Sequence, residues 1–226
     1  MTPPPAALAL RRFADAARCA DALADAVAAD LIDAAAARGR AGLIVAGGAT
    51  PVPFFQALAT RPLPWAAITV TLSDERWVPP DHPDSNEAAV RRWLLDPLGA
   101  TGPHFIALKT PAPTAAQAAI EGGGALAALR PFDVAVLGVG EDGHVASLFP
   151  GDEAALAATG GCVAVRGPKP PPERLSLTMD VLGECRRLYL HTRGADKLAA
   201  LQAPGDLPLG RLLRRAHSPV GYHAAA

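Results

Sequence analysis

The sequence predicts an α/β fold, a Rossmann-like three-layer sandwich around a mostly parallel sheet, and three observations support this prediction. Short apolar runs alternate along the chain with longer segments whose apolar residues recur at helical spacing. One of the short runs, at residues 43–46, is apolar at every position, as in strands that helices cover on both faces. Glycine and proline separate these segments and no long linker divides them, so we expect residues 1–226 to form one domain.

The first predicted elements are a short strand at residues 7–13 and a long helix at residues 15–38. The helical segment is rich in alanine, and Leu23, Val27 and Leu31 recur at every fourth position. That spacing gives the helix one apolar face, which we expect to pack against the sheet.

Strands and helices then alternate to the end of the chain. Residues 43–46 form a continuous apolar run after a glycine turn, which is typical of a strand inside a parallel sheet. The elements expected after it are a helix at 53–59, a strand at 68–72, helices at 86–95 and 115–129, strands at 132–137, 162–165 and 188–191, and a helix at 195–202. The proline-rich stretches 111–113 and 168–172 are predicted loops.

Composition excludes several classes of function. The formal net charge is -1 and no long run of like charge occurs, so we expect no nucleic-acid partner. The three cysteines are widely spaced and form no Cys-x-x-Cys pair, which indicates reduced thiols in a cytoplasmic protein. The chain starts with prolines at 3–5 and reaches two arginines at 11–12 after a short apolar stretch, so neither a signal peptide nor a membrane span is expected. The sequence does not indicate an oligomeric state.

In open α/β sheets, ligands bind beyond the carboxyl ends of the strands, so the loops that leave the apolar runs are candidate sites. The first such loop is Gly47, Gly48, Ala49, Thr50 and Pro51, between a predicted strand and a predicted helix. Glycines permit a tight turn with exposed amides, the threonine can cap the helix, and the proline suits its first position. These features predict a phosphate cradle, with an ordinary strand-to-helix turn as the alternative.

The second candidate loop follows the predicted strand at residues 68–72. It contains Asp74, Glu75 and Arg76, which could bind the hydroxyls and the negative charge of a ligand. Charged side chains in solvent at a loop are the alternative interpretation.

The third candidate loop runs from Gly138 to His144 after the predicted strand at residues 132–137, and it matches the pattern G-x-G-x-x-G. A dinucleotide site also needs a long following helix and an acidic residue about 20 positions further on. Pro150 and Gly151 interrupt the segment soon after the histidine, so we do not expect a nicotinamide cofactor.

What remains in this loop is a histidine with Asp142 two positions before it. A neutral imidazole can accept a proton from water and return it to a leaving oxygen, although a lone histidine is more often structural. Backbone amides around Gly140 could stabilise an oxyanion. No second histidine or cysteine lies at zinc-ligand spacing, and no G-x-S-x-G elbow occurs, so neither a zinc site nor a serine hydrolase is expected.

Taken together, the segments resemble the signature segments of the 6-phosphogluconolactonases. The matching segments are 47–51, 73–76 with 85–86, 137–151 and 170–178, in the order expected for that family. The resemblance implies hydrolysis of 6-phospho-D-glucono-1,5-lactone to 6-phosphogluconate, the second step of the oxidative pentose phosphate pathway, with no cofactor and no metal.

The resemblance also implies roles for individual residues. His144 would be the general base on water, and Asp142 would orient or tune its ring. The loop formed by Gly47, Gly48, Ala49 and Thr50 would hold the phosphate, Asp74 would lie near the sugar ring, and Arg76 would assist with either Lys169 or Arg174. The family often has serine at the position of Ala49, so we expect one hydroxyl contact to be missing and affinity to be lower.

Two other functions are compatible with parts of this pattern. Glucosamine-6-phosphate deaminases share the glycine, aspartate and histidine loop, but they need a glutamate five positions after the histidine, where this chain has Phe149. A sugar-phosphate sensor without turnover would carry a DNA-binding helix-turn-helix, which the sequence does not indicate.

Overall fold

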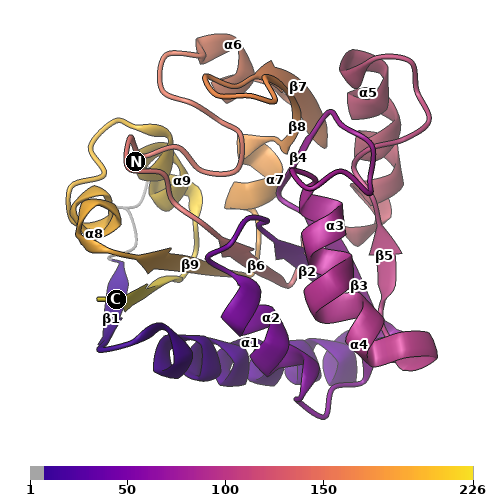
Figure 1. Ribbon diagram of the computed structural model, residues 1–226, viewed down its shortest axis with the longest axis vertical. Helices are drawn as coiled ribbons and strands as arrows, with labels where there is room; N and C mark the ends of the chain where they lie inside the picture. Colours follow the sequence, from indigo (N-terminus) through magenta and orange to yellow (C-terminus); the bar gives the residue numbers. More distant parts are fainter. Residues whose placement is uncertain (1–7, 226) are drawn as a thin grey trace.

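The computed structural model describes residues 8–225, which form two sheets with helices around them (Figure 1). The larger sheet has the strand order β1-β10-β9-β6-β2-β3-β5, and every neighbouring pair is parallel. Its strands are β1 Ala9–Phe13, β2 Ala41–Val45, β3 Ile68–Leu72, β5 His104–Ile106, β6 Val134–Leu137, β9 Arg187–Arg193 and β10 Pro219–Ala224. Residue 7, the predicted start of the first strand, and the N-terminal prolines lie outside the described residues.

Helices lie on both sides of the large sheet, so the predicted α/β sandwich is confirmed (Figure 1). The α-helices of the described chain are α1 Ala16–Arg38, α2 Val52–Ala59, α3 Asn86–Val90, α4 Asp96–Leu98, α5 Ala115–Leu126, α6 Glu153–Leu156, α7 Met179–Gly183, α8 Ala195–Gln202 and α9 Pro208–Arg215. Figure 1 shows α1 and α2 together on one side of the sheet. None of these helices is long and apolar enough to cross a membrane.

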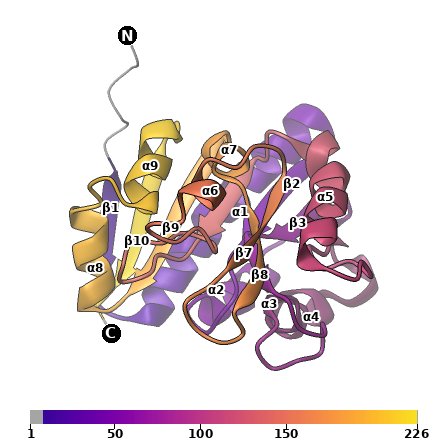
Figure 2. The same ribbon diagram turned by 90° about the horizontal axis from the view of Figure 1, so that it is seen from above.

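A second, smaller sheet is antiparallel and has the order β4-β8-β7. Its strands are β4 Asp74–Arg76, β8 Glu173–Leu177 and β7 Cys162–Arg166. From above, β7 and β8 lie across the middle of the molecule, between α9 and α5 (Figure 2). The strand expected at residues 162–165 therefore exists but belongs to this small sheet, where most of its residues are only half-buried, and not to the parallel sheet.

Several predicted elements have the same bounds in the structure, or nearly the same. Asp15 caps α1 by accepting a hydrogen bond from the amide of Arg18 at 2.8 Å, as expected for a helix that starts there. The predicted strand at residues 68–72 and the predicted helix at residues 195–202 have the bounds of β3 and α8. The helix expected at residues 86–95 instead changes into a π-helical turn after Val90.

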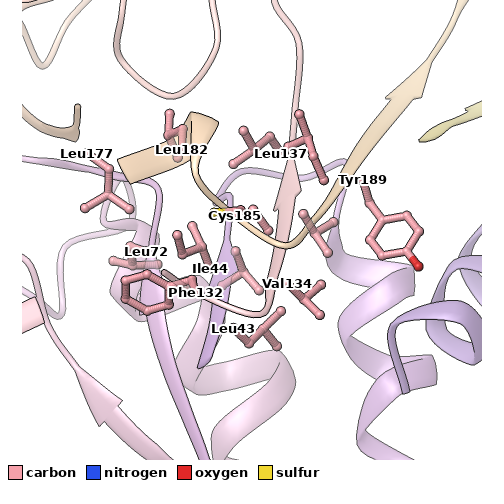
Figure 3. Close-up of a cluster of buried hydrophobic side chains, with 14 of the residues drawn as sticks. Leu43, Ile44, Leu72, Phe132, Val134, Leu137, Leu177, Leu182, Cys185 and Tyr189 are labelled. Atoms are coloured by element: carbon pink, nitrogen blue, oxygen red, sulfur yellow. The ribbon is translucent and has the colours of Figure 1, made fainter. Parts of the chain in front are cut away.

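The core lies between the large sheet and the layers on either side. Figure 3 shows apolar side chains of β2, β3 and β6 packed against those of β8 and α7. The fully buried residues of this cluster include Leu43, Ile44, Leu72, Val134, Leu137, Leu177 and Leu182. Because β2 and β6 are buried along their whole length, the loops that leave them start from a rigid base.

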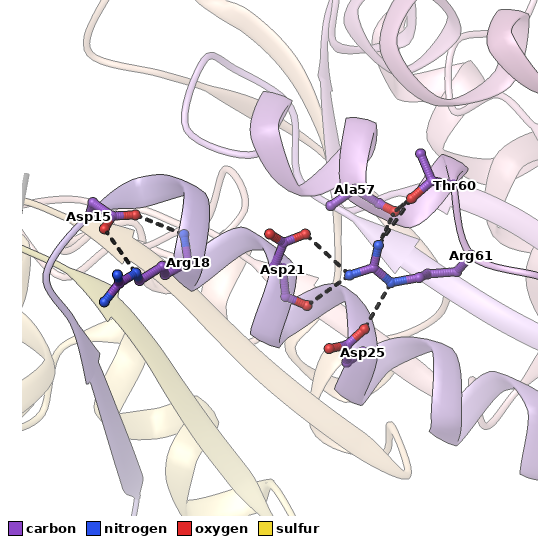
Figure 4. A network of polar contacts seen from close by, with 7 residues as sticks. All are labelled: Asp15, Arg18, Asp21, Asp25, Ala57, Thr60 and Arg61. Atoms are coloured by element: carbon purple, nitrogen blue, oxygen red, sulfur yellow. Dashed lines mark hydrogen bonds and ion pairs between the residues drawn. The ribbon is translucent and has the colours of Figure 1, made fainter.

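A polar network fixes the position of α2 on α1 (Figure 4). Arg61, just beyond the end of α2, donates hydrogen bonds to Asp25 at 2.8 Å, to Asp21 at 3.2 Å and to the carbonyl of Ala57 at 3.2 Å. Exposed ion pairs of this kind contribute little stability individually, but they restrict the direction of the helix. The direction of α2 matters because its opposite end opens on the cavity described next.

Candidate active site

The strand order places β9, β6, β2 and β3 side by side, so the loops at their carboxyl ends meet. These loops surround a cavity of about 680 Å³. All ten candidate residues from the sequence line this cavity: Gly47, Gly48, Ala49, Thr50, Asp74, Arg76, Asp142, His144, Lys169 and Arg174. Segments that lie more than 100 residues apart in the chain are thus brought into one site.

The glycine loop connects β2 to α2 and needs glycine at two positions for different reasons. Gly48 has a φ of 87°, in the left-handed region that other residues rarely adopt. A Cβ on Gly47 would come within 2.1 Å of Oδ1 of Asn86, so only glycine leaves room for that side chain. Asn86 in turn donates a hydrogen bond to the carbonyl of Asp74 at 2.8 Å, so one side chain packs on the first loop and is bonded to the second.

The prediction that Thr50 caps the helix is wrong. The structure has Pro51 as the N-cap of α2, one position before its first residue Val52, and no side chain makes a capping hydrogen bond there. Proline has no side-chain acceptor, so the residue at the N-cap position leaves the start of α2 without a capping bond. This uncapped helix end faces the cavity through Thr50 and Pro51, which suits an anionic ligand.

Glu75 is buried and holds the second loop together. Its carboxylate accepts hydrogen bonds from the amides of Arg76, Asn86 and Glu87 at 2.6 to 2.7 Å and from the hydroxyl of Ser85 at 2.9 Å. Burial raises the pKa of Glu75, and these four donors act against that rise. The side chain is therefore a structural anchor between β4 and the start of α3, and it does not line the cavity.

We expect Glu75→Gln to lower the free energy of unfolding by about 2 kcal/mol or more, because a buried donor without a partner costs about 1–3 kcal/mol. Each carboxylate oxygen accepts two donors, so the amide nitrogen of glutamine must face at least one backbone N–H wherever it points. Urea unfolding measures the loss, and exposed Glu173→Gln in β8 is the matched control. Equal stability of the two variants would contradict the anchoring role.

Asp74 joins the second loop to the third. Its carboxylate accepts hydrogen bonds from the hydroxyl of Ser73 at 2.9 Å and from that of Ser147 at 2.6 Å, and all three side chains are buried. Asp74 also lines the cavity, as the expectation of a place near the sugar ring requires. Each of its two oxygens accepts one of these hydrogen bonds. Because Ser147 comes three residues after His144, Asp74 also helps to position the loop of that histidine.

The third loop presents the imidazole of His144 beside the carboxylate of Asp142. Nδ1 of the ring lies 2.6 Å from Oδ1 of the aspartate, which also accepts a hydrogen bond from the amide of His144 at 3.2 Å. Burial opposes ionisation of Asp142, but the hydrogen bonds and charge of His144 outweigh it, so the pKa of the carboxyl is lowered. The histidine side chain keeps 32% of its surface exposed, so its outer edge can meet a ligand.

Gly140 leaves room for the ring of His144, because a Cβ at this position would lie 2.1 Å from Nδ1 of the histidine.

The expectation that amides around Gly140 stabilise an oxyanion is wrong for two of them. The amide of Gly140 donates to the carbonyl of His144 at 2.9 Å, and that of Gly143 donates to the carbonyl of Gly140 at 3.0 Å. These bonds close the loop on itself and leave neither N–H free for a ligand.

Two arginines face one another across the small sheet at the cavity wall. Arg76 of β4 is the direct cross-strand partner of Arg174 of β8. Burial, together with the positive charge of Arg76, lowers the pKa of Arg174. Like charges at directly opposed positions destabilise a sheet, so an anion between them would be stabilising.

Lys169 contributes to the same wall through the loop before β8. Arg174 donates hydrogen bonds to the carbonyl of Lys169 at 3.1 Å and to that of Pro171 at 3.3 Å, so it shapes this loop as well as facing the cavity. Its guanidinium also lies 5.5 Å from the ring centroid of Phe149. Both candidates for the phosphate contact thus border the cavity, and the arginine is the more firmly held of the two.

Several cavity residues were not assigned from the sequence. Phe149 packs on the ring of His144 with centroids 4.8 Å apart, and His191 and Lys197 extend the lining on the side of β9 and α8. Lysine occurs only at Lys109, Lys169 and Lys197, and that scarcity is a signal that could have singled out the last of them.

In residues 8–225, no group of three or more histidine, cysteine or acidic side chains is arranged to hold a metal ion.

The chain is similar to known proteins over most of its length. Residues 14–212 match the family model described as glucosamine-6-phosphate isomerases/6-phosphogluconolactonase. A 6-phosphogluconolactonase from Pseudomonas putida is 44% identical over 88% of this chain and 84% of the relative. One from Rhizobium meliloti (strain 1021) is 43% identical over 94% of this chain and 97% of the relative.

Solved structures are similar to this chain as well. A crystal structure of a 6-phosphogluconolactonase from Shewanella baltica OS155 superposes with a TM-score of 0.89 at 33% identity, over 99% of this chain and 100% of that one. A monomeric glucosamine-6-phosphate deaminase superposes with a TM-score of 0.80 at 18% identity, which shows a common fold alone.

Proposed function

Because the chain belongs to the glucosamine-6-phosphate isomerase/6-phosphogluconolactonase family, we propose how its cavity carries out the reaction of its lactonase relatives. That reaction is the hydrolysis of 6-phosphogluconolactone to 6-phosphogluconate, a step of the oxidative pentose phosphate pathway. The observation that carries the assignment of residues is the pairing of His144 with Asp142 at 2.6 Å, in the same cavity as the glycine loop and two arginines.

In the proposed mechanism, His144 is the general base. Its Nδ1–H donates a hydrogen bond to the carboxylate of Asp142, so the ring proton stays on Nδ1 and the lone pair of Nε2 is free to accept a proton from water. The water oxygen forms a bond to the lactone carbonyl carbon, and the carbonyl becomes a tetrahedral oxyanion. When that intermediate collapses, the bond from carbon to the ring oxygen breaks, and the imidazolium returns its proton to this oxygen.

The phosphate of the substrate binds away from the reacting carbon in this proposal. The glycine loop supplies backbone amides and the start of α2 supplies its positive helix end, while Arg76 and Arg174 supply two guanidiniums. Lys169 and Lys197 add positive charge at the rim. Binding the phosphate fixes the lactone against the water, which makes the attack effectively intramolecular.

The deaminase alternative lacks its required acid. The position five residues after His144 is Phe149, whose ring is 8% exposed and packs on the imidazole. A phenyl ring cannot transfer a proton, so it can support the position of His144 but not ring opening of an amino sugar.

A direct assay tests the proposed function. Freshly generated 6-phosphogluconolactone, unphosphorylated gluconolactone and glucosamine 6-phosphate are offered to the enzyme, and spontaneous lactone opening is subtracted. We expect rapid hydrolysis of the first, much lower kcat/KM for the second, and no ammonia from the third. Stabilisation by 6-phosphogluconate without lactone turnover would support a sensor instead.

We expect Asp142→Asn to lower kcat by about 10- to 100-fold, which corresponds to the loss of one close charge pair at a partly exposed site. The amide oxygen of asparagine can still accept a hydrogen bond from Nδ1–H, but without a negative charge it no longer stabilises the imidazolium that forms during attack. Steady-state kinetics with the phosphorylated lactone measures this. A normal kcat would show that the carboxylate charge plays no part.

A cytoplasmic location is also part of this proposal. The unpaired thiols of Cys19, Cys162 and Cys185 support it, because such thiols are typical of a reducing compartment.

A further inference from the structure

His191 is a buried polar residue of the cavity that the proposed mechanism does not use. It is 5% exposed, lies at the carboxyl end of β9 and lines the cavity. Its Nδ1 is sealed from solvent and has no hydrogen-bond partner among the described residues. A buried polar group without a partner is uncommon in folded proteins, so its surroundings need an explanation.

The position of His191 in the sheet puts it beside the phosphate cradle. Side chains alternate along a strand, so those of Arg187, Tyr189 and His191 in β9 point to the same face of the sheet. The first two contact Asp30 of α1, at 3.5 and 2.5 Å respectively. This is the face that α1 and α2 cover (Figure 1).

On that face, His191 lies against the first turn of α2. Its ring meets that of Phe54 edge-on, with centroids 6.3 Å apart, and Phe54 is the third residue of this helix. The strand register agrees with this placement, because Leu190 pairs with Leu137 of β6 and Val136 pairs with Val45 of β2. His191 is therefore level with the start of the glycine loop, two strands away.

The two ring nitrogens of His191 have different surroundings, and this difference determines the tautomer. A proton on Nδ1 would be a buried donor without an acceptor, which is rarer and more costly than an unused acceptor. The proton of the neutral ring is therefore on Nε2. Burial, assisted by the positive charge of Lys197, lowers the pKa of His191 to about 4, so the ring is neutral near pH 7.

We propose that His191 is a further phosphate-binding residue, which donates a hydrogen bond from Nε2 to a phosphate oxygen of the substrate held at the start of α2. This inference rests on the proposed function, because it assumes that the phosphate lies in that cradle. A neutral donor adds a directional contact where Lys197, Arg76 and Arg174 already supply positive charge. His191 thereby helps to select a phosphorylated lactone over a plain one.

The test uses three substitutions at this position. His191→Phe keeps an aromatic ring against Phe54 but removes the donor. His191→Gln places an amide nitrogen near the position of Nε2, whereas His191→Asn places it near that of Nδ1. We expect the phenylalanine and asparagine variants to raise KM for the phosphorylated lactone about tenfold or more, the loss expected for one hydrogen bond to a charged group.

The same experiment includes controls for the role of phosphate. We expect kcat to change little, kcat/KM for unphosphorylated gluconolactone to stay as in wild type, and the Kd of 6-phosphogluconate by calorimetry to rise as much as KM. The glutamine variant should restore most of the affinity. Thermal melting confirms that each variant is folded.

Other results overturn the inference in distinguishable ways. Arg174→Met serves as the reference for the phosphate site itself. If it raises KM while His191→Phe does not, only the role of His191 is wrong. If neither raises KM, the phosphate position in the proposed function is wrong as well. Equal losses on both lactones would show that His191 shapes the cavity without contacting phosphate.

Discussion

His144→Ala is expected to lower kcat for 6-phosphogluconolactone by about two to four decades, the range that general acid-base catalysis contributes. The side chain supplies both proton transfers of the proposed mechanism, and alanine can supply neither. KM should change little, because the phosphate contacts lie on other loops. Hydrolysis of freshly generated lactone, corrected for spontaneous opening, measures the effect.

The fold should tolerate this substitution. His144 is partly exposed, and its backbone closes the loop through the bond from the amide of Gly140 to its carbonyl, which alanine can also make. His217→Ala, at an exposed position outside the cavity, is the matched control and should have normal turnover. If His144→Ala keeps a kcat within about threefold of the control, the assignment as general base is wrong.

The sequence predicts the parallel sheet well, because strands that are buried on both faces appear in the sequence as uninterrupted apolar runs. The runs of β2 and β6 are apolar at every position, and the buried face of α1 continues for about four turns, from Cys19 to Ala34. β4 has no such signal, since it consists of Asp74, Glu75 and Arg76. Its pairing with β8 depends on a segment about 100 residues away, which local patterns cannot indicate.

The same contrast applies to the cavity. Its glycine loops could be predicted because a strand followed by glycine is a local pattern, and parallel strands bring such loops to one edge. The hydrogen-bond partners could not be predicted in this way. Thr50 looked like a cap and is not one, and the amide of Gly140 is used inside its own loop. His191 appeared only as the end of a strand, because its role depends on the contact with Phe54 of α2.

Replacing both arginines of the small sheet is expected to have the largest effect on substrate affinity. Arg76→Met and Arg174→Met should each raise KM for the phosphorylated lactone by about tenfold or more, since a hydrogen bond to a charged group contributes about 1.5–3 kcal/mol. Methionine keeps the apolar stem of the side chain, so the packing of β4 and β8 should persist. The double variant should bind still more weakly than either single one.

The double variant also separates binding from repulsion between the two guanidiniums. They occupy opposed positions in the sheet, so removing one relieves a like-charge contact in the empty protein and partly offsets any loss of stability. We therefore expect thermal stability without ligand to change little, while stabilisation by 6-phosphogluconate largely disappears. Exposed Arg166→Met at the end of β7 is the matched control. Undiminished stabilisation of the double variant by 6-phosphogluconate would show that these two arginines, the only ones lining the cavity among residues 8–225, do not hold the phosphate.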